Sequence, residues 1–193
     1  MNYICFGRSL SIAVLMLGVA GCSPRQESSP AKAKSSQTAV SPAAAGTAAS
    51  LPKLGKAPAW ELKDLEGATV RSDQFAGKVV VVDFWATWCP PCRAEIPGYV
   101  ELQKKYGKDG FVIIGVSLDQ GGPEVVKAFA AKNAVNYSMV MGTDAVVAAF
   151  GGVEAIPTTF LIDRTGQIRD RKLGAEETAE YEKKILSILR DKA

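Results

Sequence analysis

The sequence contains no histidine and only four cysteines in 193 residues. Without an imidazole group the chain cannot form a Ser-His-Asp triad or a Cys-His pair, and it lacks the usual imidazole ligand of copper. A closed zinc site needs four protein ligands, usually cysteine or histidine. The cysteines are Cys5, Cys22, Cys89 and Cys92, so the positions of these four thiols decide which chemistry remains.

The sequence also lacks a long apolar run. The run over residues 10–20 follows Arg8 and leads through small residues to Cys22. A membrane-spanning helix needs about 20 apolar residues, whereas this shorter run fits the apolar core of a signal peptide. The flanking VAGC resembles the lipobox of bacterial lipoproteins, in which the signal is cut just before a cysteine that is then lipidated. We expect residues 1–21 to be a lipoprotein signal peptide and Cys22 the lipidation site; an uncleaved short anchor over residues 4–20 is the alternative.

Residues 23–50 contain no aromatic side chain and consist mainly of Ala, Ser, Pro, Thr, Gln, Gly and Lys. Such a segment cannot bury enough apolar surface to offset the entropy of ordering, so we interpret residues 22–55 as a lipidated flexible tether with an r.m.s. reach of about 30 Å. This predicts an extracytoplasmic domain, tethered on the periplasmic side to the cell membrane or the outer membrane. A formal net charge of +3 gives no indication of nucleic acid binding.

Residues 56–193 show the hydrophobic periodicity of one α/β domain. KVVVVDFWA and FVIIGVSLD have no polar alternation, as expected for strands buried on both faces of a sheet. Two short strands around Glu66 and Gly67 form a predicted N-terminal hairpin, YSMVM a further strand, and TTFLID with QIRDRKLG a C-terminal hairpin. Helices are expected over residues 91–106, 124–132, 144–150 and 176–189. The pattern predicts an α/β sandwich with parallel central strands and an antiparallel edge.

The stretch ATWCPPCRAE, residues 86–95, places Cys89 and Cys92 two residues apart. Attachment of a c-type haem requires histidine directly after the second cysteine, and that residue is Arg93. After processing of the N-terminus only these two thiols remain, too few for a closed zinc site without carboxylates or a partner. A purely structural disulfide across so small a loop would contribute well below the roughly 3 kcal/mol of a 15-residue loop. A redox-active dithiol is therefore the favoured interpretation.

The position of the pair also favours redox chemistry. Cys89 follows a buried strand and precedes the first turn of a helix, where free backbone N–H groups and the helix dipole stabilise a thiolate. Cys92 lies one turn into the helix and is expected to be less exposed. We expect Cys89 to be the attacking thiolate and Cys92 the resolving thiol.

The string VVVVDFWATWCPPCRAEIP strongly resembles the active site of thioredoxin-fold proteins. Together with GGVEAIPTTFLIDRTGQI it resembles the TlpA/ResA-like branch of membrane-tethered thiol-disulfide oxidoreductases, often grouped with the AhpC/TSA-type redoxins. The resemblance covers residues 56–190 and implies a thioredoxin-like three-layer sandwich: a central mixed sheet with parallel core strands and a C-terminal β-hairpin, an N-terminal β-hairpin extension, and helices on both faces. Residues 122–141 match the insertion typical of this branch.

Two acidic residues acquire roles through the resemblance. Asp83 interrupts a buried strand, where a carboxylate is costly unless it is neutralised or paired. The matching acid of thioredoxins exchanges a proton with the resolving cysteine; the alternative is an aspartate satisfied by a neighbouring lysine or by water. Glu95 follows Cys92 by three residues on the same helix face. A glutamate there tunes the dithiol in this branch; the alternative is a solvated first-turn residue stabilised by the helix dipole.

The resemblance also implies a substrate-binding surface. Pro157 matches the family's cis-proline, which holds the preceding backbone against the sulfur atoms so that an incoming peptide can pair with it as a short strand. Ile156 would then face the substrate, and Trp88 would be an exposed aromatic beside the sulfurs, whereas Trp85 is expected in the core. The predicted substrate-binding residues are Trp88, Pro90, Pro91, Ile156 and Pro157.

Pro90 and Pro91 offer no side-chain donor to a thiolate, and two nearby acids disfavour its charge. We therefore expect a reductant in which Cys89 attacks a disulfide of an exported protein and Cys92 resolves the mixed disulfide after losing its proton to Asp83 or Glu95. No cofactor is required. By resemblance, a transmembrane thiol reductase of the DsbD/CcdA kind supplies electrons, and oxidised apocytochrome c is a possible substrate.

Two other functions use the same thiols. Peroxiredoxins of the wider superfamily have a proline and a threonine before the peroxidatic cysteine, at positions occupied here by Val82 and Ala86; this mismatch disfavours a thiol-dependent peroxidase. A metallochaperone could bind Cu(I) through Cys89 and Cys92 alone. These remain the alternatives to a thiol-disulfide oxidoreductase.

Overall fold

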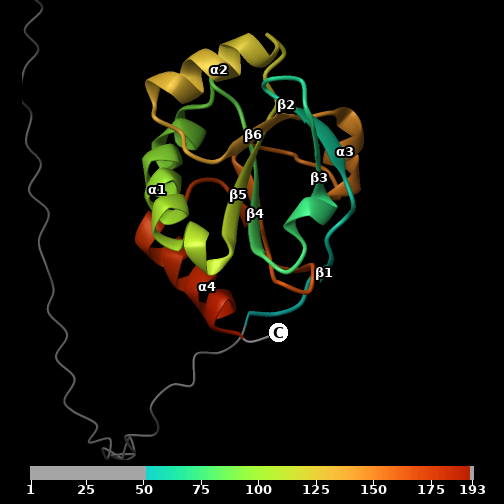
Figure 1. Ribbon diagram of the computed structural model, residues 1–193, viewed down its shortest axis with the longest axis vertical. Helices are drawn as coiled ribbons and strands as arrows, with labels where there is room; N and C mark the ends of the chain where they lie inside the picture. The colour runs from blue at the N-terminus through green and yellow to red at the C-terminus, as the bar shows by residue number, and fades with distance from the viewer. Residues whose placement is uncertain (1–50, 192–193) are drawn as a thin grey trace, which may run out of the picture. The chain divides into compact units, whose positions relative to one another are not determined.

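The computed structural model describes residues 51–191 (Figure 1). The predictions for the signal peptide, for lipidation at Cys22 and for the tether up to residue 50 lie outside this range. No helix within the described range has both the length and the apolar character needed to cross a membrane.

An eight-stranded mixed sheet forms the centre of the described domain, with strand order β1-β8-β7-β4-β5-β6-β2-β3. β4 and β5 are parallel, as are β5 and β6, whereas the remaining neighbours are antiparallel. The parallel centre and antiparallel edges confirm the predicted α/β class. The strands are β1 (Gly55–Lys56), β2 (Glu61–Asp64), β3 (Thr69–Arg71), β4 (Val79–Trp85), β5 (Phe111–Ser117), β6 (Ser138–Met141), β7 (Thr158–Ile162) and β8 (Gln167–Leu173).

Four α-helices and two short 3-10 turns surround the described sheet. α1 and α4 lie side by side against one face, and α3 lies at the opposite face (Figure 1). The helices therefore cover both faces, as predicted. They are α1 (Pro90–Tyr106), α2 (Pro123–Lys132), α3 (Asp144–Ala149) and α4 (Thr178–Arg190); the 3-10 turns are η1 (Ser72–Phe75) and η2 (Gly107–Asp109).

Side-chain alternation in β4 divides the core into two layers. Val79 and Val81 pack with residues of α1 and α4, whereas Val80, Val82 and Phe84 pack with α3 and its surroundings. Because neighbouring side chains of a strand point to opposite faces, Asp83 belongs to the same face as Val79 and Val81. The buried carboxyl group of Asp83 is thus directed into the layer that contains α1.

The N-terminal hairpin forms as predicted, with β2 and β3 joined around Glu66 and Gly67. It extends the sheet beyond β6. β1 was not predicted: its two residues, Gly55 and Lys56, are exposed and pair with β8 at the opposite edge. A two-residue strand with no buried side chain has no hydrophobic pattern by which sequence could identify it.

A β-bulge in the C-terminal hairpin determines which side chains enter the α1 layer. Leu161 pairs with Asp170 and Ile162 pairs with Ile168, so the register passes over Arg169. Beyond this shift Thr159 is opposite Lys172 on β8 and opposite Asp83 on β4. Paired residues of antiparallel strands lie on the same face. Asp83, Thr159 and Lys172 therefore form one row across three strands.

Candidate active site

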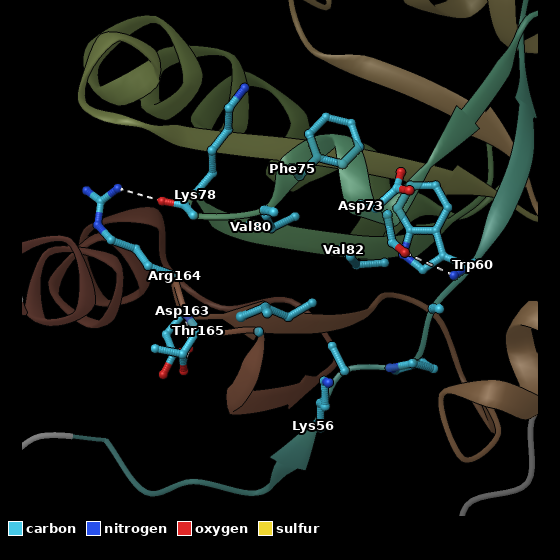
Figure 2. A pocket seen from close by; sticks show the side chains of 18 residues that line it. Lys56, Trp60, Asp73, Phe75, Lys78, Val80, Val82, Asp163, Arg164 and Thr165 are labelled. Carbon is cyan, nitrogen blue, oxygen red and sulfur yellow. Dashed lines mark hydrogen bonds between the residues drawn. The ribbon is translucent and has the colours of Figure 1, made fainter. Parts of the chain in front are cut away.

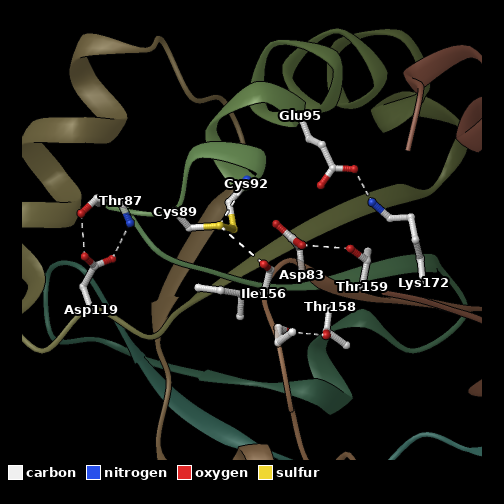
Figure 3. Close-up of a disulfide and its surroundings, with 11 residues drawn as sticks. Asp83, Thr87, Cys89, Cys92, Glu95, Asp119, Ile156, Thr158, Thr159 and Lys172 are labelled. Carbon is white, nitrogen blue, oxygen red and sulfur yellow. Dashed lines mark hydrogen bonds and ion pairs between the residues drawn. A yellow bond between two sulfur atoms is a disulfide. The ribbon is translucent and has the colours of Figure 1, made fainter. Parts of the chain in front are cut away.

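Cys89 and Cys92 form a disulfide at the junction of β4 with α1, with an S–S distance of 2.06 Å (Figure 3). Cys89 is the N-cap of α1, and the backbone N–H of Cys92 donates to its sulfur at 3.3 Å. Pro90 and Pro91 occupy the first helical positions, where a missing backbone N–H costs no helical hydrogen bond. The Cys89 sulfur thus lies where backbone donors at the start of α1 can stabilise a negative charge.

The two sulfur-bearing residues are almost equally buried in the disulfide form, at 3% exposure for Cys89 and 2% for Cys92. Exposure of this form therefore does not assign the attacking and the resolving cysteine. Their places in the helix do differ: Cys89 caps α1, whereas Cys92 lies within its first turn. The assignment of Cys89 as the attacking thiol stays a prediction from that position.

The loop before β7 approaches the disulfide from the other side. The peptide bond between Ile156 and Pro157 is cis, in agreement with the prediction. The carbonyl oxygen of Ile156 lies 3.7 Å from the Cys89 sulfur, and the Thr158 hydroxyl donates to the carbonyl of Ala155 at 2.6 Å, which fastens the turn. In the reduced form the Cys89 thiol could donate to the Ile156 carbonyl.

The predicted substrate-binding residues surround the sulfur atoms on two segments. Trp88 is 66% exposed, and Pro90 and Pro91 are also exposed on the other side of Cys89. Ile156 is half-buried and Pro157 is buried. The structure thus places an exposed apolar rim around a buried disulfide, while Trp85 lies in the core as predicted.

Asp83 is buried on the α1 face of β4, with 3% of its surface exposed. The hydroxyl of Thr159 donates to its carboxyl oxygen at 3.0 Å, and Figure 3 shows the carboxyl group between the disulfide and Thr159. The pKa of Asp83 is raised to about 7, chiefly by burial and also by the charge of Glu95, whereas the hydrogen bond from Thr159 and the charge of Lys172 lower it. Asp83 can therefore gain or lose a proton near neutral pH.

Glu95 is buried, so the alternative of a solvated residue is wrong. Its Oε1 atom accepts hydrogen bonds from the ammonium group of Lys172 and, at 3.1 Å, from the backbone N–H of Glu176. Its Oε2 atom has no hydrogen-bond partner within the described part of the chain. The alternative for Asp83 was a pairing with a neighbouring lysine. A lysine does reach the buried acids, but it contacts Glu95. Lys172 was not predicted from the sequence.

A second set of residues that was not predicted from the sequence fixes the loop before Cys89. Asp119, just after β5, accepts hydrogen bonds from the backbone N–H of Thr87 at 2.9 Å and from its hydroxyl at 2.6 Å (Figure 3). The Ser117 hydroxyl also donates to this carboxylate, at 2.9 Å. These bonds fix the loop that carries Trp88. An acidic residue two positions after the strand FVIIGVS was the available signal, because carboxyl ends of parallel strands lie together.

One cavity of the described domain does not involve the cysteines. About 500 Å³ in volume, it lies between the segment before β2, η1 and the α3-side face of β4, with Trp60, Phe75, Val80 and Val82 among its lining residues (Figure 2). Its two carboxylates already have partners, since Asp73 binds Arg71 and Asp163 binds Arg169. The cavity therefore lacks a reactive group comparable with the disulfide, and the thiol site is the candidate active site.

Comparisons with known proteins show similarity to thiol-disulfide oxidoreductases. The model of the AhpC/TSA family matches residues 55–171. The thiol-disulfide oxidoreductase ResA of Geobacillus thermodenitrificans is 39% identical over 114 residues, which cover 58% of this chain and 64% of that protein. The protein of the same name from Bacillus thuringiensis is 35% identical over 137 residues, covering 69% of this chain and 79% of the relative.

Among solved structures, a putative thiol:disulfide interchange protein DsbE from Chlorobium tepidum superposes with a TM-score of 0.66 and 33% sequence identity. The alignment covers 72% of this chain and 99% of that one. The similarity confirms the predicted thioredoxin-like fold. The chain belongs to the AhpC/TSA family, in its branch of ResA-like thiol-disulfide oxidoreductases.

Proposed function

We propose that this thiol-disulfide oxidoreductase is a reductant of disulfides in exported proteins, with oxidised apocytochrome c as a candidate substrate. The observation that supports this direction is the buried Asp83 carboxyl group, whose pKa of about 7 reflects burial and the charge of Glu95. A second negative charge on a thiolate beside it would be unfavourable. No cationic side chain within residues 51–191 forms a hydrogen bond or ion pair with either sulfur. In the reduced form, a thiolate is therefore stabilised mainly by the backbone N–H groups at the start of α1.

The reaction begins from the dithiol form. The Cys89 thiolate attacks one sulfur of the target disulfide, the target S–S bond breaks, and the released target thiolate takes up a proton. Cys92 then loses its proton to Asp83, and the Cys92 thiolate attacks the Cys89 sulfur of the mixed disulfide. The second target sulfur leaves as a thiolate and takes up a proton, and two electrons have moved from the dithiol to the target. The Cys89–Cys92 disulfide seen here is the product of this cycle.

Peptide binding is supported by the geometry of the loop before β7. The Ile156 carbonyl lies beside the Cys89 sulfur, where an extended target segment can pair with the backbone as an added strand. Trp88, Pro90 and Pro91 supply the exposed apolar contacts next to it. This arrangement suits an unfolded or extended target better than a deep pocket would.

The proposal includes placement and electron supply. Residues 1–21 act as a lipoprotein signal, Cys22 bears the lipid, and residues up to 55 tether the domain on the extracytoplasmic side of the cell membrane or outer membrane. Because thiols are not kept reduced there by a glutathione pool, electrons come from a transmembrane thiol reductase of the DsbD/CcdA kind. The apolar run before Cys22 supports this placement.

The reduction potential of the Cys89/Cys92 couple tests the direction. We expect a value near that of thioredoxin, about −270 mV, measured by equilibration of the full chain with dithiol buffers. A value near the oxidising catalyst DsbA, about −120 mV, would overturn the reductase proposal.

The substrate is tested by trapping. In Cys92→Ala the mixed disulfide between Cys89 and a target cannot be resolved, so covalent complexes should accumulate in cells and can be identified by mass spectrometry. Cys89→Ala is the matched control and should trap no such complexes. Recovery of complexes only with cytoplasmic proteins would contradict the extracytoplasmic proposal.

A further inference from the structure

Lys172 is a buried cation in the layer that contains the disulfide, and the reaction described above does not use it. The row across three strands places it opposite Thr159, which in turn is opposite Asp83. Lys172 therefore reaches the active-site layer from the far side of β7. Figure 3 shows its side chain directed toward Glu95, with Asp83 and Thr159 nearby.

The contacts of Lys172 are those of a fully engaged ammonium group. It donates to Glu95 Oε1 and, at 3.2 Å, to the hydroxyl of Tyr99. Its nitrogen lies 5.7 Å from the centre of the Tyr99 ring and 5.1 Å from that of Tyr181. A buried ammonium group is costly without such partners. Replacing a whole buried ion pair by well-packed apolar residues is often neutral or stabilising, so the Glu95–Lys172 pair is weakly explained by stability and points to a use other than packing.

The local charges do not balance. Two carboxyl groups, of Asp83 and Glu95, share one lysine, and the lysine binds Glu95. The remaining oxygen of Glu95 has no hydrogen-bond partner among the described residues, and in Figure 3 it lies on the side nearer Asp83. Glu95 and Lys172 act on Asp83 in opposite directions: the negative charge raises its pKa, and the positive charge lowers it.

We propose that Lys172 is a positioning residue for thiol-disulfide exchange, whose ammonium group holds Glu95 in an ion pair and sets the charge balance that reserves Asp83 as the carrier of the Cys92 proton. The inference rests on the role proposed above for Asp83. It divides the work of the two acids: Glu95 is a fixed member of an ion pair, and Asp83 is the group that exchanges a proton. Without Lys172 the two carboxyl groups would compete for one proton.

Other titratable groups pack around Asp83, Glu95 and Lys172. Their charges should stay the same in the variants compared below. Burial keeps the pKa of Tyr99, Tyr137 and Tyr181 well above the usual range, so these phenols stay neutral. Lys184 on α4 lies near the Tyr181 ring but binds other acids. The groups around Lys172 and Asp83 are Cys89, Cys92, Glu95, Tyr99, Tyr137, Asp170, Glu176, Tyr181 and Lys184.

The test measures the titration midpoint of Asp83 by NMR of ¹³C-labelled aspartate carboxyl groups in the oxidised full chain. Lys172→Met should raise the midpoint by about one pH unit, and Glu95→Gln should lower it by a similar amount. The double variant should return close to the wild-type midpoint. Lys184→Met, which removes a neighbouring cation that does not contact Glu95, is the matched control and should leave the midpoint unchanged.

Opposite shifts that cancel are the signature of charge balance, because loss of packing would not produce them. No shift in Lys172→Met, or a shift of the same sign as in Glu95→Gln, would overturn the proposal. If Lys172→Met does not fold, the double variant is compared with Glu95→Gln alone. Removal of Lys172 must then still raise the midpoint, and an unchanged value overturns the proposal.

The kinetic consequence is measured on the resolving step. A rise of one unit in the Asp83 midpoint should slow release of a model mixed disulfide about tenfold at pH 6, and Lys172→Arg, which keeps the positive charge, should restore most of the rate. An unaltered rate in Lys172→Met would count against the proposal. The NMR midpoints require no substrate and no direction of electron flow, so an oxidising potential would refute the reductase proposal and leave this result standing.

Discussion

Two buried aspartates, one on β4 and one just after β7, lie near opposite ends of β7 and differ in their electrostatic surroundings. Asp83 is opposite Thr159, near the start of the strand, and Asp163 follows its last residue. Both are almost equally hidden from water, at 3% and 8% exposure. Their pKa values nevertheless shift in opposite directions: that of Asp83 is raised to about 7 and that of Asp163 is lowered.

Two things differ: Asp163 lies closer to the protein surface, so burial raises its pKa less, and it has more hydrogen-bond donors. Burial pushes the pKa of Asp163 upward, but hydrogen bonds from Thr165, Gln167 and Arg169 outweigh it. Two of these donors are backbone N–H groups at 2.9 and 3.0 Å, and Arg169 completes an ion pair at 3.0 Å. Asp83 receives a single hydrogen bond within the described residues, from Thr159. A buried carboxylate is structural when it is saturated with donors and reactive when it is left short of them.

The largest expected effect is a gain of stability on replacing Asp83. Its folded-state pKa exceeds the unfolded value of about 3.9, so the folded state binds the proton more tightly, and the free energy of unfolding falls as pH rises from about 4 to about 7. Asp83→Asn removes this loss and should stabilise the oxidised chain at pH 8 by on the order of 4 kcal/mol. Urea unfolding at pH 8 and pH 4 measures it.

The gain should fall to about 0.5 kcal/mol at pH 4, where Asp83 is protonated in the folded state and about half protonated in the unfolded state. An equal gain at both pH values would show that the effect is packing and not ionisation. Glu61→Gln is a surface control, because Glu61 is exposed on β2, and it should change stability little at either pH.

The reverse effect is expected for Asp163. Its lowered pKa means that the carboxylate contributes stability above the unfolded pKa, and that this contribution is lost as pH falls through the folded value. Asp163→Asn should destabilise the chain by about 3 kcal/mol at pH 7, because it weakens the contact with buried Arg169 and the bonds that close the β7–β8 turn. Thermal unfolding should show the loss at pH 7 and a smaller one at pH 3. A stabilised variant would refute the comparison.

The smallest expected effect is a change in the pKa of Asp83 when its one hydrogen-bond donor within the described residues, Thr159, is replaced. Thr159→Val removes its hydrogen bond at nearly constant volume and should raise the Asp83 pKa by about one unit. Carboxyl NMR titration measures the shift. Thr159→Ser should keep the wild-type value, and Thr158→Val is the control on the neighbouring position, because Thr158 bonds the Ala155 carbonyl and not Asp83. No shift in Thr159→Val would mean that this bond does not influence the acid.

Much of the fold could be predicted because its signals are local. The apolar run of β4, interrupted only by Asp83, indicated a strand buried on both faces, and Pro91 marked the first turn of α1. The positions of Cys89, Cys92 and Asp83 followed from the same stretch. Glu95 was assigned to the correct helix face, but whether it is solvated or buried depends on a partner 77 residues away, which no local pattern reveals.

Lys172 could not be found from sequence because of the bulge at Arg169. Counting along an uninterrupted hairpin from Ile162 and Ile168 would place Arg171 opposite Thr159 and Lys172 on the other face. The bulge shifts the register by one, so Lys172 faces α1, and Arg171 lies over the Phe160 ring on the opposite face. A one-residue shift exchanges the faces of every side chain that follows.

The same bulge limits how this hairpin can change in evolution. Loss of the bulge with every residue retained would pair Arg171 with Thr159, so that the guanidinium group enters the acidic layer and the lysine leaves it, whereas deletion of the bulged Arg169 would leave Lys172 opposite Thr159. A relative with the same residues but no bulge would therefore have a differently shaped charge beside its reactive acid. In this branch, strand register as well as residue identity must be compared before a buried cation is inferred from one sequence for another.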